Sequence, residues 1–203
     1  MTLVKGWGYL PGKLFIISDT HFGHDSIIGP AHRPFVSGGE MDDYMIRSWN
    51  EMVNQEDTVI HLGDFTMKTT NHAISLLRQL NGRIYFIPGN HDSWYRNASK
   101  VKQRIVEEVI TILPLLTELK INGRWVTMCH YPMKEWRNSL DGGLHLHGHT
   151  HNTTPLYYRS QHGPMVIPEE VGYAFNMCVE HWSYAPVQWE IIESVVQRFE
   201  NAL

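Results

Sequence analysis

The stretch Leu14-Phe-Ile-Ile-Ser-Asp-Thr-His21 decides the fold. Residues 14–18 are a short, mostly apolar run, and such a run predicts a strand that is buried on both faces. Asp19 and His21 follow directly, so a carboxylate and an imidazole stand at the carboxyl end of this strand. In α/β folds, ligands bind just beyond the carboxyl ends of the strands. The stretch therefore predicts both a buried strand and a polar site at its end.

Two similar apolar runs follow in the first half of the chain, at residues 58–62 and 83–87. Segments with helical periodicity separate the strands. The apolar side chains of residues 41–53 recur on one helical face, and those of residues 73–80 repeat the pattern. A further helix is predicted within residues 93–109. Alternating strands and helices favour parallel pairing of the three strands.

The second half of the chain contains hairpin signals instead. Asn122-Gly123 joins two predicted strands, 115–121 and 125–129, and is the strongest short signal for a two-residue hairpin turn. Hairpins added to parallel strands predict an α/β fold with mixed sheets covered by helices. The remaining predicted elements are strands at 144–147 and 173–179, a closing amphipathic helix at 187–199, and a segment at 157–166 that is either irregular or a hairpin.

Length and charge narrow the class of protein. The chain has 203 residues, a formal net charge of −4 and a pI near 6.3. No repeat, low-complexity tract or linker divides it, so we expect one domain over residues 1–203. Surfaces that bind extended nucleic acid are usually basic, so we do not expect such binding.

The cysteines and the apolar runs indicate the cellular compartment of the protein. Cys129 and Cys178 indicate no disulfide framework, and we expect both to be small apolar core residues in a reducing compartment. No run of about 18 apolar residues predicts a membrane span, and the first residues lack a signal-peptide core. We therefore expect a cytoplasmic protein without membrane contact.

Five predicted strands are each followed by residues of the types that bind metals. The blocks are Asp19-Thr-His21, Gly63-Asp64-Phe65, Pro88-Gly-Asn-His-Asp92, His130 and His147-Gly-His-Thr-His151. Each block alone has a plainer explanation, such as a turn, a helix cap or a buried histidine. Five blocks at successive strand ends favour a common site.

These blocks resemble the motifs of the calcineurin-like metallophosphoesterase family, in the family's order. The matching residues are Asp19-x-His21, Gly63-Asp64, Gly89-Asn90-His91-Asp92, His130 and Gly148-His149-x-His151. The wider context is similar to a small bacterial and phage branch of single-domain phosphoesterases. The resemblance implies a metal-dependent phosphoric ester hydrolase with a layered α-β-β-α sandwich, in which two mixed sheets are flanked by helices.

The resemblance also implies a role for each matching residue. Asp19, His21, Asp64 and His151 match the ligands of a first metal ion. Asp64, Asn90, His130 and His149 match those of a second, so that Asp64 bridges the two. His91 matches a residue that contacts phosphate and protonates the leaving oxygen as a general acid, and Asp92 is expected to orient His91 or to stabilise its charge. Asp92 is alternatively a cap of the following helix, and the two roles are compatible.

Two metal ions suit the chemistry of phosphate esters, which are anionic and resist attack by neutral water. Two cations about 3.5–4 Å apart neutralise the phosphate and activate the attacking hydroxide between them. Ligands that mix nitrogen and oxygen without thiolate favour borderline divalent metals over calcium or magnesium. We favour manganese, with iron, nickel, cobalt and zinc as alternatives.

Several residues near the motifs are weaker candidates. His24 and Arg33 follow the first ligands and are expected to contact the phosphate, with a solvated loop as an equal alternative. We interpret His61 and His147 as partners of the ligands, and His145 as structural. Four nearby aromatic residues either stack on a nucleobase or, more commonly for such residues, pack in the core. They are Trp94, Tyr95, Tyr131 and Trp136.

The short segment between His130 and His149 leaves no space for a large capping domain there, which predicts an open site. An open site with few cations favours a monoanionic diester, so we expect a phosphodiesterase acting on a small, nucleotide-like phosphate ester. The main alternative is a phosphomonoesterase, including protein phosphatases, which a cluster of arginines would favour. A nuclease and a non-catalytic binding module rank lower, and the oligomeric state stays open.

Overall fold

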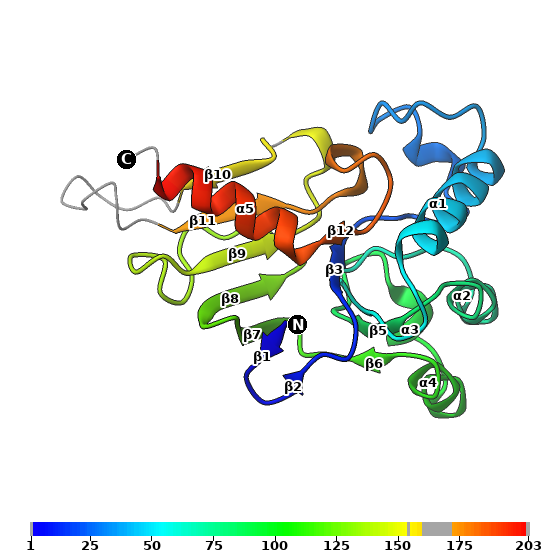
Figure 1. The fold of residues 1–203 in the computed structure, drawn as a ribbon. Helices are drawn as coiled ribbons and strands as arrows, with labels where there is room; N and C mark the ends of the chain where they lie inside the picture. Colours follow the sequence, from blue (N-terminus) through cyan, green and yellow to red (C-terminus); the bar gives the residue numbers. More distant parts are fainter. Residues whose placement is uncertain (1, 154, 160–171, 202–203) are drawn as a thin grey trace.

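The computed structural model describes residues 2–153, 155–159 and 172–201 (Figure 1). Two mixed sheets are flanked by helices, which confirms the predicted α/β class. The five-stranded sheet has the order β12-β3-β4-β5-β6. Its strands are β3 (Leu14–Ile17), β4 (Thr58–His61), β5 (Arg83–Phe86), β6 (Thr111–Ile112) and β12 (Val187–Gln188). Strands β3, β4 and β5 pair in parallel, as the first half of the chain predicts.

The side chains of β3 alternate between two separate apolar cores. Phe15 and Ile17 belong to a core shared with helices, whereas Leu14 and Ile16 belong to a core that contains residues of both sheets. All four are buried. The alternation follows from the two-residue period of a strand. Because both faces of β3 are buried, the strand has a fixed position. The start of the loop that follows Ser18 is therefore fixed as well.

Four helices cover one face of the five-stranded sheet (Figure 1). They are α1 (Gly38–Met52), α2 (Thr70–Leu77), α3 (Ser93–Arg96) and α4 (Lys100–Glu107). The first helix begins earlier than predicted, because Ser37 accepts a hydrogen bond from the Glu40 backbone N and caps it. The single helix predicted within residues 93–109 is two helices, since Ser99 caps a new helix after the break.

The seven-stranded sheet has the order β10-β11-β9-β8-β7-β1-β2. Its strands are β1 (Leu3–Val4), β2 (Gly8–Tyr9), β7 (Leu116–Ile121), β8 (Arg124–Cys129), β9 (Leu144–His147), β10 (Tyr157–Arg159) and β11 (Tyr173–Asn176). Asn122 and Gly123 have φ values of 48° and 90°, as a primed two-residue turn requires, so the predicted hairpin is confirmed. The sequence did not predict β1, β2 or β6, which have two residues each.

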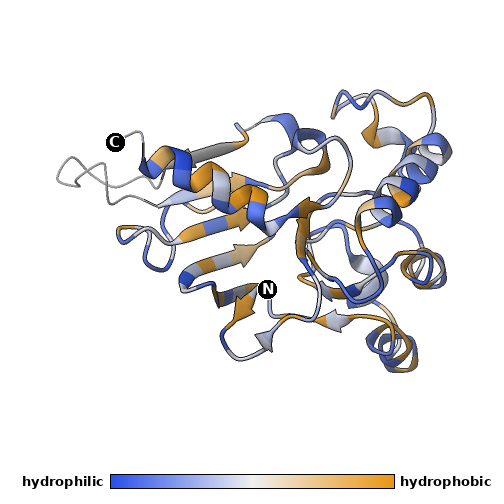
Figure 2. Ribbon diagram, viewed as in Figure 1, coloured by the Kyte–Doolittle hydropathy of each residue, from blue (hydrophilic) through white to orange (hydrophobic). Residues whose placement is uncertain are grey.

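The last helix, α5 (Trp189–Glu200), packs onto the core that contains both sheets through Trp189, Ile192 and Val196. Figure 2 shows apolar and polar residues interspersed along this helix, as expected for an amphipathic element. The residues just before it pair with β3 as β12 and are not helical.

Part of one predicted segment lies outside the described residues. Residues 157–159 form β10, and the rest of the segment 157–166 is not described. Among the described helices, none is both long enough and apolar enough to cross a membrane.

Candidate metal centre

Loops from the carboxyl ends of strands in both sheets meet at one place. The backbone N of Asp19, after β3, donates to the Gly63 carbonyl after β4 at 2.9 Å. The backbone N of His149, after β9, donates to Asp19 Oδ2 at 2.9 Å and joins the two sheets. The predicted site therefore lies between two sheets and draws on both.

Four side chains form a first group of facing ligand atoms. Asp19 Oδ1 lies 3.8 Å from His21 Nε2 and 3.8 Å from His151 Nε2, and His21 Nε2 lies 3.6 Å from Asp64 Oδ2. Among the described residues, Asp19 Oδ1 and His21 Nε2 are buried atoms without a hydrogen-bond partner. Buried polar atoms without partners are costly. Their convergence with two further donors fits a bound cation.

A second group shares Asp64 with the first. Asp64 Oδ2 lies 3.3 Å from His130 Nε2, which lies 2.9 Å from Asn90 Oδ1. Asp64, His130 and His149 can each offer one ligand atom within 4.8 Å of the others, and Asp19, His21 and Asp64 form a similar set. One Asp64 carboxylate thus faces two sets of donors. The structure brings together all seven residues that the sequence proposed as ligands.

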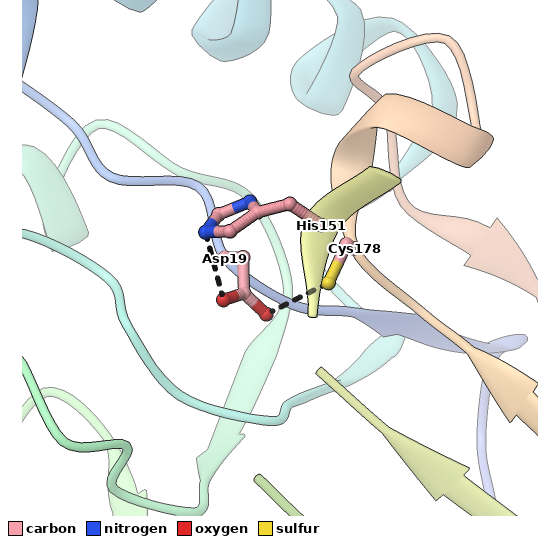
Figure 3. Close-up of side chains that lie close together, drawn as sticks. All are labelled: Asp19, His151 and Cys178. Carbon is pink, nitrogen blue, oxygen red and sulfur yellow. Dashed lines mark hydrogen bonds and ion pairs between the residues drawn. The ribbon is translucent and has the colours of Figure 1, made fainter. Parts of the chain in front are cut away.

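Asp19 presents a single free oxygen to this centre. Its Oδ2 accepts hydrogen bonds from Ser18 Oγ, from the His149 backbone N and, at 3.3 Å, from Cys178 Sγ (Figure 3). Figure 3 also shows the His151 ring on the Oδ1 side of the carboxylate. Three donors on Oδ2 leave Oδ1 for a cation and fix its direction.

The carboxylates give the centre a negative potential. Burial raises the pKa of Asp19, but the hydrogen bond and charges of neighbouring histidines outweigh burial and hold the pKa well below its ordinary value. Burial lowers the pKa of His130, but Asp64 and Asp19 more than compensate and raise it to about 9. The carboxylates therefore favour positive charge at the position where the ligand atoms converge.

Ligand residues adopt an unusual backbone conformation. Positive φ values between 44° and 72° occur at Asp19, His21, Asp64, His149 and His151. A non-glycine residue in this region costs on the order of 1–3 kcal/mol, and such strain clusters at functional sites. Five strained residues in one place indicate that side-chain placement is maintained against a local backbone cost.

Close backbone approach explains two glycines in the motifs. A Cβ on Gly148 would clash with Ser18 Oγ and Asp19 Oδ2, and one on Gly89 would clash with Asp64 Oδ1. Only glycine lets these loops lie directly against the two carboxylates.

Hydrogen bonds at Nδ1 orient three of the histidines. His130 Nδ1 donates to the Leu62 carbonyl at 2.9 Å, and His151 Nδ1 lies 2.9 Å from Glu180 Oε1. His21 Nδ1 lies 3.2 Å from His24 Nδ1. Each contact leaves Nε2 directed at the centre, the arrangement usual for histidines that bind metals.

Arg33 does not lie where the sequence placed it. We expected it at the phosphate, but its side chain is buried and all three guanidinium nitrogens bind protein groups. Nε donates to Glu180, Nη1 to the Thr20 carbonyl, and Nη2 to the Asp19 carbonyl at 2.7 Å. A further contact joins Nη1 to Met41 Sδ. Because its guanidinium nitrogens bind these protein groups, Arg33 stabilises the loop after β3 and is not directed at a phosphate.

Asp92 also differs from its expected role. Its carboxylate accepts from the backbone N of Asp64, Phe65 and Gly89 and from Trp94 Nε1, at 2.7–2.9 Å. It stands at the cap position of α3 without a side-chain capping bond. Burial raises its pKa, and the hydrogen bonds oppose that effect. Asp92 therefore ties the loops after β4 and β5 together, and none of its described hydrogen bonds goes to the His91 ring.

His91 and Tyr131 line the rim of the centre. The His91 backbone N donates to Asp64 Oδ1 at 2.8 Å, its ring lies 5.5 Å from that of His21, and the residue is partly exposed. Tyr131 is 50% exposed, with its ring 4.7 Å from the His149 ring. Of the four aromatic candidates, Trp94 and Trp136 are buried, and the half-buried Tyr95 donates its hydroxyl to Glu107. Tyr131 is the candidate that is exposed and in contact with the ligands.

Two other histidines have structural hydrogen bonds. His61 Nδ1 accepts from the Gly63 backbone N at 3.1 Å, so Nε2 carries the proton toward Thr20 Oγ1. His145 Nδ1 donates to the Thr127 carbonyl, and Nε2 accepts from the Met133 backbone N. Burial lowers the pKa of His61 to about 3 and that of His145 to about 4, which keeps both neutral.

The sequence missed two residues that touch the centre. Cys178 is buried as expected, yet it also contacts Asp19 and belongs to a potential ligand set with Asp19 and His151. Glu180 contacts His151 and Arg33. The sequence prediction extended this strand to residue 179 and so placed Cys178 inside it. The observed strand β11 ends at Asn176, and the strand-end rule applied to that end points to both residues.

The chain resembles known proteins in sequence and fold. The model of the calcineurin-like phosphoesterase superfamily domain matches residues 13–168. The chain is 32% identical over 188 residues to the uncharacterized protein MJ1445 of Methanocaldococcus jannaschii, with 92% of each chain covered. It is 29% identical over 160 residues to the Gene 66 protein of Mycobacterium phage D29, which covers 69% of this chain and 79% of the phage protein.

A solved structure supports the fold. The crystal structure of a protein of unknown function from Aquifex aeolicus has a TM-score of 0.61 at 21% identity and covers 90% of this chain and 98% of its own. Two mixed sheets flanked by helices, ligand-type residues gathered at their strand ends, and a family match over most of the chain agree with one another. The chain belongs to the calcineurin-like phosphoesterase superfamily.

Proposed function

We propose that this protein is a phosphodiesterase that uses two divalent metal ions, with a small nucleotide-like phosphate ester as substrate. The observation that carries the proposal is the position of Asp64, whose Oδ2 faces both His21 Nε2 and His130 Nε2. A shared carboxylate is how two like-charged ions are held close together. We also propose a single domain over residues 1–203, because both sheets supply ligands. The proposed location is the cytoplasm.

In this proposal the ligands divide into two sets. Asp19, His21, Asp64 and His151 hold the first ion, and Asp64, Asn90, His130 and His149 hold the second. When bound, the ions neutralise the phosphate and lower the pKa of the attacking water. Mixed nitrogen and oxygen donors suit manganese, which we favour over iron, nickel, cobalt and zinc. The thiol of Cys178 donates to Asp19 Oδ2 and so orients a ligand.

His91 is the proposed general acid. Its backbone is fixed to Asp64, whereas no described residue makes a hydrogen bond to its ring. The ring is partly exposed and lies beside the His21 ring. An imidazole so placed can contact a phosphate oxygen and donate a proton to the leaving group. His24 is the second proposed phosphate contact, because it stands next to His21 on the partly exposed side of the centre.

Two features favour a nucleotide-like diester. Arg33, the arginine nearest in sequence to the first ligands, is committed to protein groups, so it adds no guanidinium to a dianionic phosphate. Tyr131 offers an exposed ring beside the second set of ligands, and base stacking on such a ring contributes about 1–3 kcal/mol.

A phosphomonoesterase is the second candidate, and Arg96 favours it. This arginine is exposed and donates to the Asn90 carbonyl, so a guanidinium lies next to a proposed ligand. Such a group suits a dianionic phosphate.

The test is hydrolysis of bis(p-nitrophenyl) phosphate against p-nitrophenyl phosphate by protein stripped of metal and reloaded with Mn²⁺. We expect metal-dependent cleavage with a higher kcat/KM for the diester. A preference for the monoester would reverse the ranking and favour the phosphomonoesterase. A protein that binds metal but cleaves neither ester, nor any nucleotide diester, would instead be a binding module.

A further inference from the structure

We propose that the buried pair Arg33–Glu180 is a positioning unit that aligns the ligands of the first metal ion and leaves the second largely unaffected. The inference rests on the two-metal centre of the proposed function. It concerns two side chains for which the motifs assign no such role, and Glu180 lies beyond the part of the chain matched by the family model.

Glu180 binds both Arg33 and His151 through one oxygen. It lies in the short helix η4 (Val179–His181), and its side chain is 1% exposed. Oε1 accepts from Arg33 Nε at 2.9 Å, from Arg33 Nη2 at 2.7 Å and from His151 Nδ1 at 2.9 Å. A carboxylate on Nδ1 fixes the tautomer and ring direction of a metal-binding histidine. Glu180 therefore directs His151 Nε2 toward Asp19.

Arg33 extends the same unit to the other side of the first site. Its Nη2 and Nη1 atoms donate to the carbonyls of Asp19 and Thr20, at 2.7 and 2.9 Å respectively. These carbonyls belong to the turn in which Asp19 and His21 have positive φ. One buried guanidinium thus holds the turn with two ligands, and its carboxylate partner holds a third ligand from the opposite sheet.

The second site is held by different contacts. His130 is oriented by the Leu62 carbonyl, and the loops that carry Asp64 and Asn90 are joined through Asp92. Neither Arg33 nor Glu180 makes a described hydrogen bond to Asn90, His130 or His149. Loss of the pair is therefore expected to weaken the two sites unequally, whereas a pair that only stabilises the fold would affect both alike.

The experiment measures Mn²⁺ affinity at each site separately, by calorimetric titration of the full chain. An Asn90→Ala background isolates the first site, and a His21→Ala background isolates the second. Glu180→Gln is introduced into both backgrounds, with Glu51→Gln as the matched control because Glu51 is an exposed residue of α1. We expect a 10–100-fold loss of affinity at the first site and less than a twofold change at the second.

Loss of the charge on Glu180 leaves a buried arginine unpaired, which can prevent folding. The double variant Arg33→Met with Glu180→Met removes both charges and is measured in the same way, with the same expected result. Equal losses at the two sites, or no loss at either, would overturn the inference. These measurements are independent of catalysis, so a chain that binds two Mn²⁺ ions without cleaving esters would refute the proposed function and leave the positioning role intact.

Discussion

The backbone N of His91 donates to Asp64 Oδ1 at 2.8 Å. This hydrogen bond joins the proposed acid to the proposed bridging ligand, and it uses one carboxylate oxygen while Oδ2 faces His21 and His130. The loop that carries Asn90 and His91 is thus set at a fixed distance from the centre. Metal binding and proton donation can therefore be tested separately, by substituting Asp64 for the first and His91 for the second.

Asp64→Asn is expected to lose both metal ions, because the bridging charge that holds two cations together is removed. Asparagine also tolerates the positive φ at this position. Metal content after dialysis, measured by mass spectrometry, should fall from two ions per chain to less than one. Asp43→Asn, at an exposed position of α1, is the control and should keep both. A fully loaded Asp64→Asn variant would exclude the bridging role.

His91→Asn is expected to keep both metals while kcat falls about 10²–10⁴-fold, the usual range for loss of a general acid. The matched control His32→Asn changes an exposed histidine and should have the parent rate. Rates are compared with an ester that has a poor leaving group, where protonation matters most. If His91→Asn turns over this ester at the parent rate, the acid assignment is wrong.

Tyr131→Ala is expected to raise KM for nucleotide diesters about tenfold, because the exposed ring beside His149 no longer stacks on a base. Tyr131→Phe keeps the ring and should keep the parent KM. Steady-state kinetics with a nucleotide diester and with a small alkyl diester separate stacking from general damage, since the alkyl ester has nothing to stack. Tyr9→Ala in β2 is an exposed control, and similar losses on both substrates would argue against a base contact.

The stability of the metal-free protein is expected to fall as pH drops from 6.5 toward 4. Burial lowers the pKa of His145 to about 4, so in this range the unfolded chain binds a proton that the folded protein does not. Stability therefore rises with pH, and the cost of going from pH 7 to pH 5 is about 2 kcal/mol for one such histidine. Urea unfolding at several pH values, in the presence of a chelator, measures this change in the free energy of unfolding.

His145→Gln removes this titration, so its unfolding free energy should depend less on pH by about the same 2 kcal/mol. The variant is expected to be less stable at pH 7, because the bonds to the Thr127 carbonyl and the Met133 backbone N are disturbed. His32→Gln, at an exposed position, should keep the parent's pH dependence. An unchanged slope in His145→Gln would show that His145 is not the group responsible.

The strand pattern of the first half was predictable because it depends on local periodicity. The run that forms β3 is apolar on both faces, and both faces are buried in separate cores. The hairpin at Asn122-Gly123 was equally predictable, since its positive φ angles are a property of those two residues. The two-residue strands were not, because their pairing depends on distant partners such as β7 for β1.

Sequence reasoning was less successful for Arg33 and Asp92. Arg33 is a charged residue near a motif and Asp92 is one within a motif, which favours a contact with the substrate or with a catalytic residue. Arg33 instead bonds to the Asp19 carbonyl and to Glu180, and Asp92 bonds to the backbone N of Asp64 in the loop after β4. The positions of those groups follow from how the loops pack, which no local pattern contains.

The sequence by itself determined which residues end the strands and therefore which side chains are available as ligands. Carboxylates and imidazoles at successive strand ends, with glycine where the backbone must approach closely, are readable from order and spacing. Only the tertiary structure decided that two sheets share the centre, through the bond from His149 to Asp19, and that Glu180 and Arg33 support it from within. The physical reason is that strand ends are set by local periodicity, whereas the distance between two loops is set by the packing of distant segments around a common core.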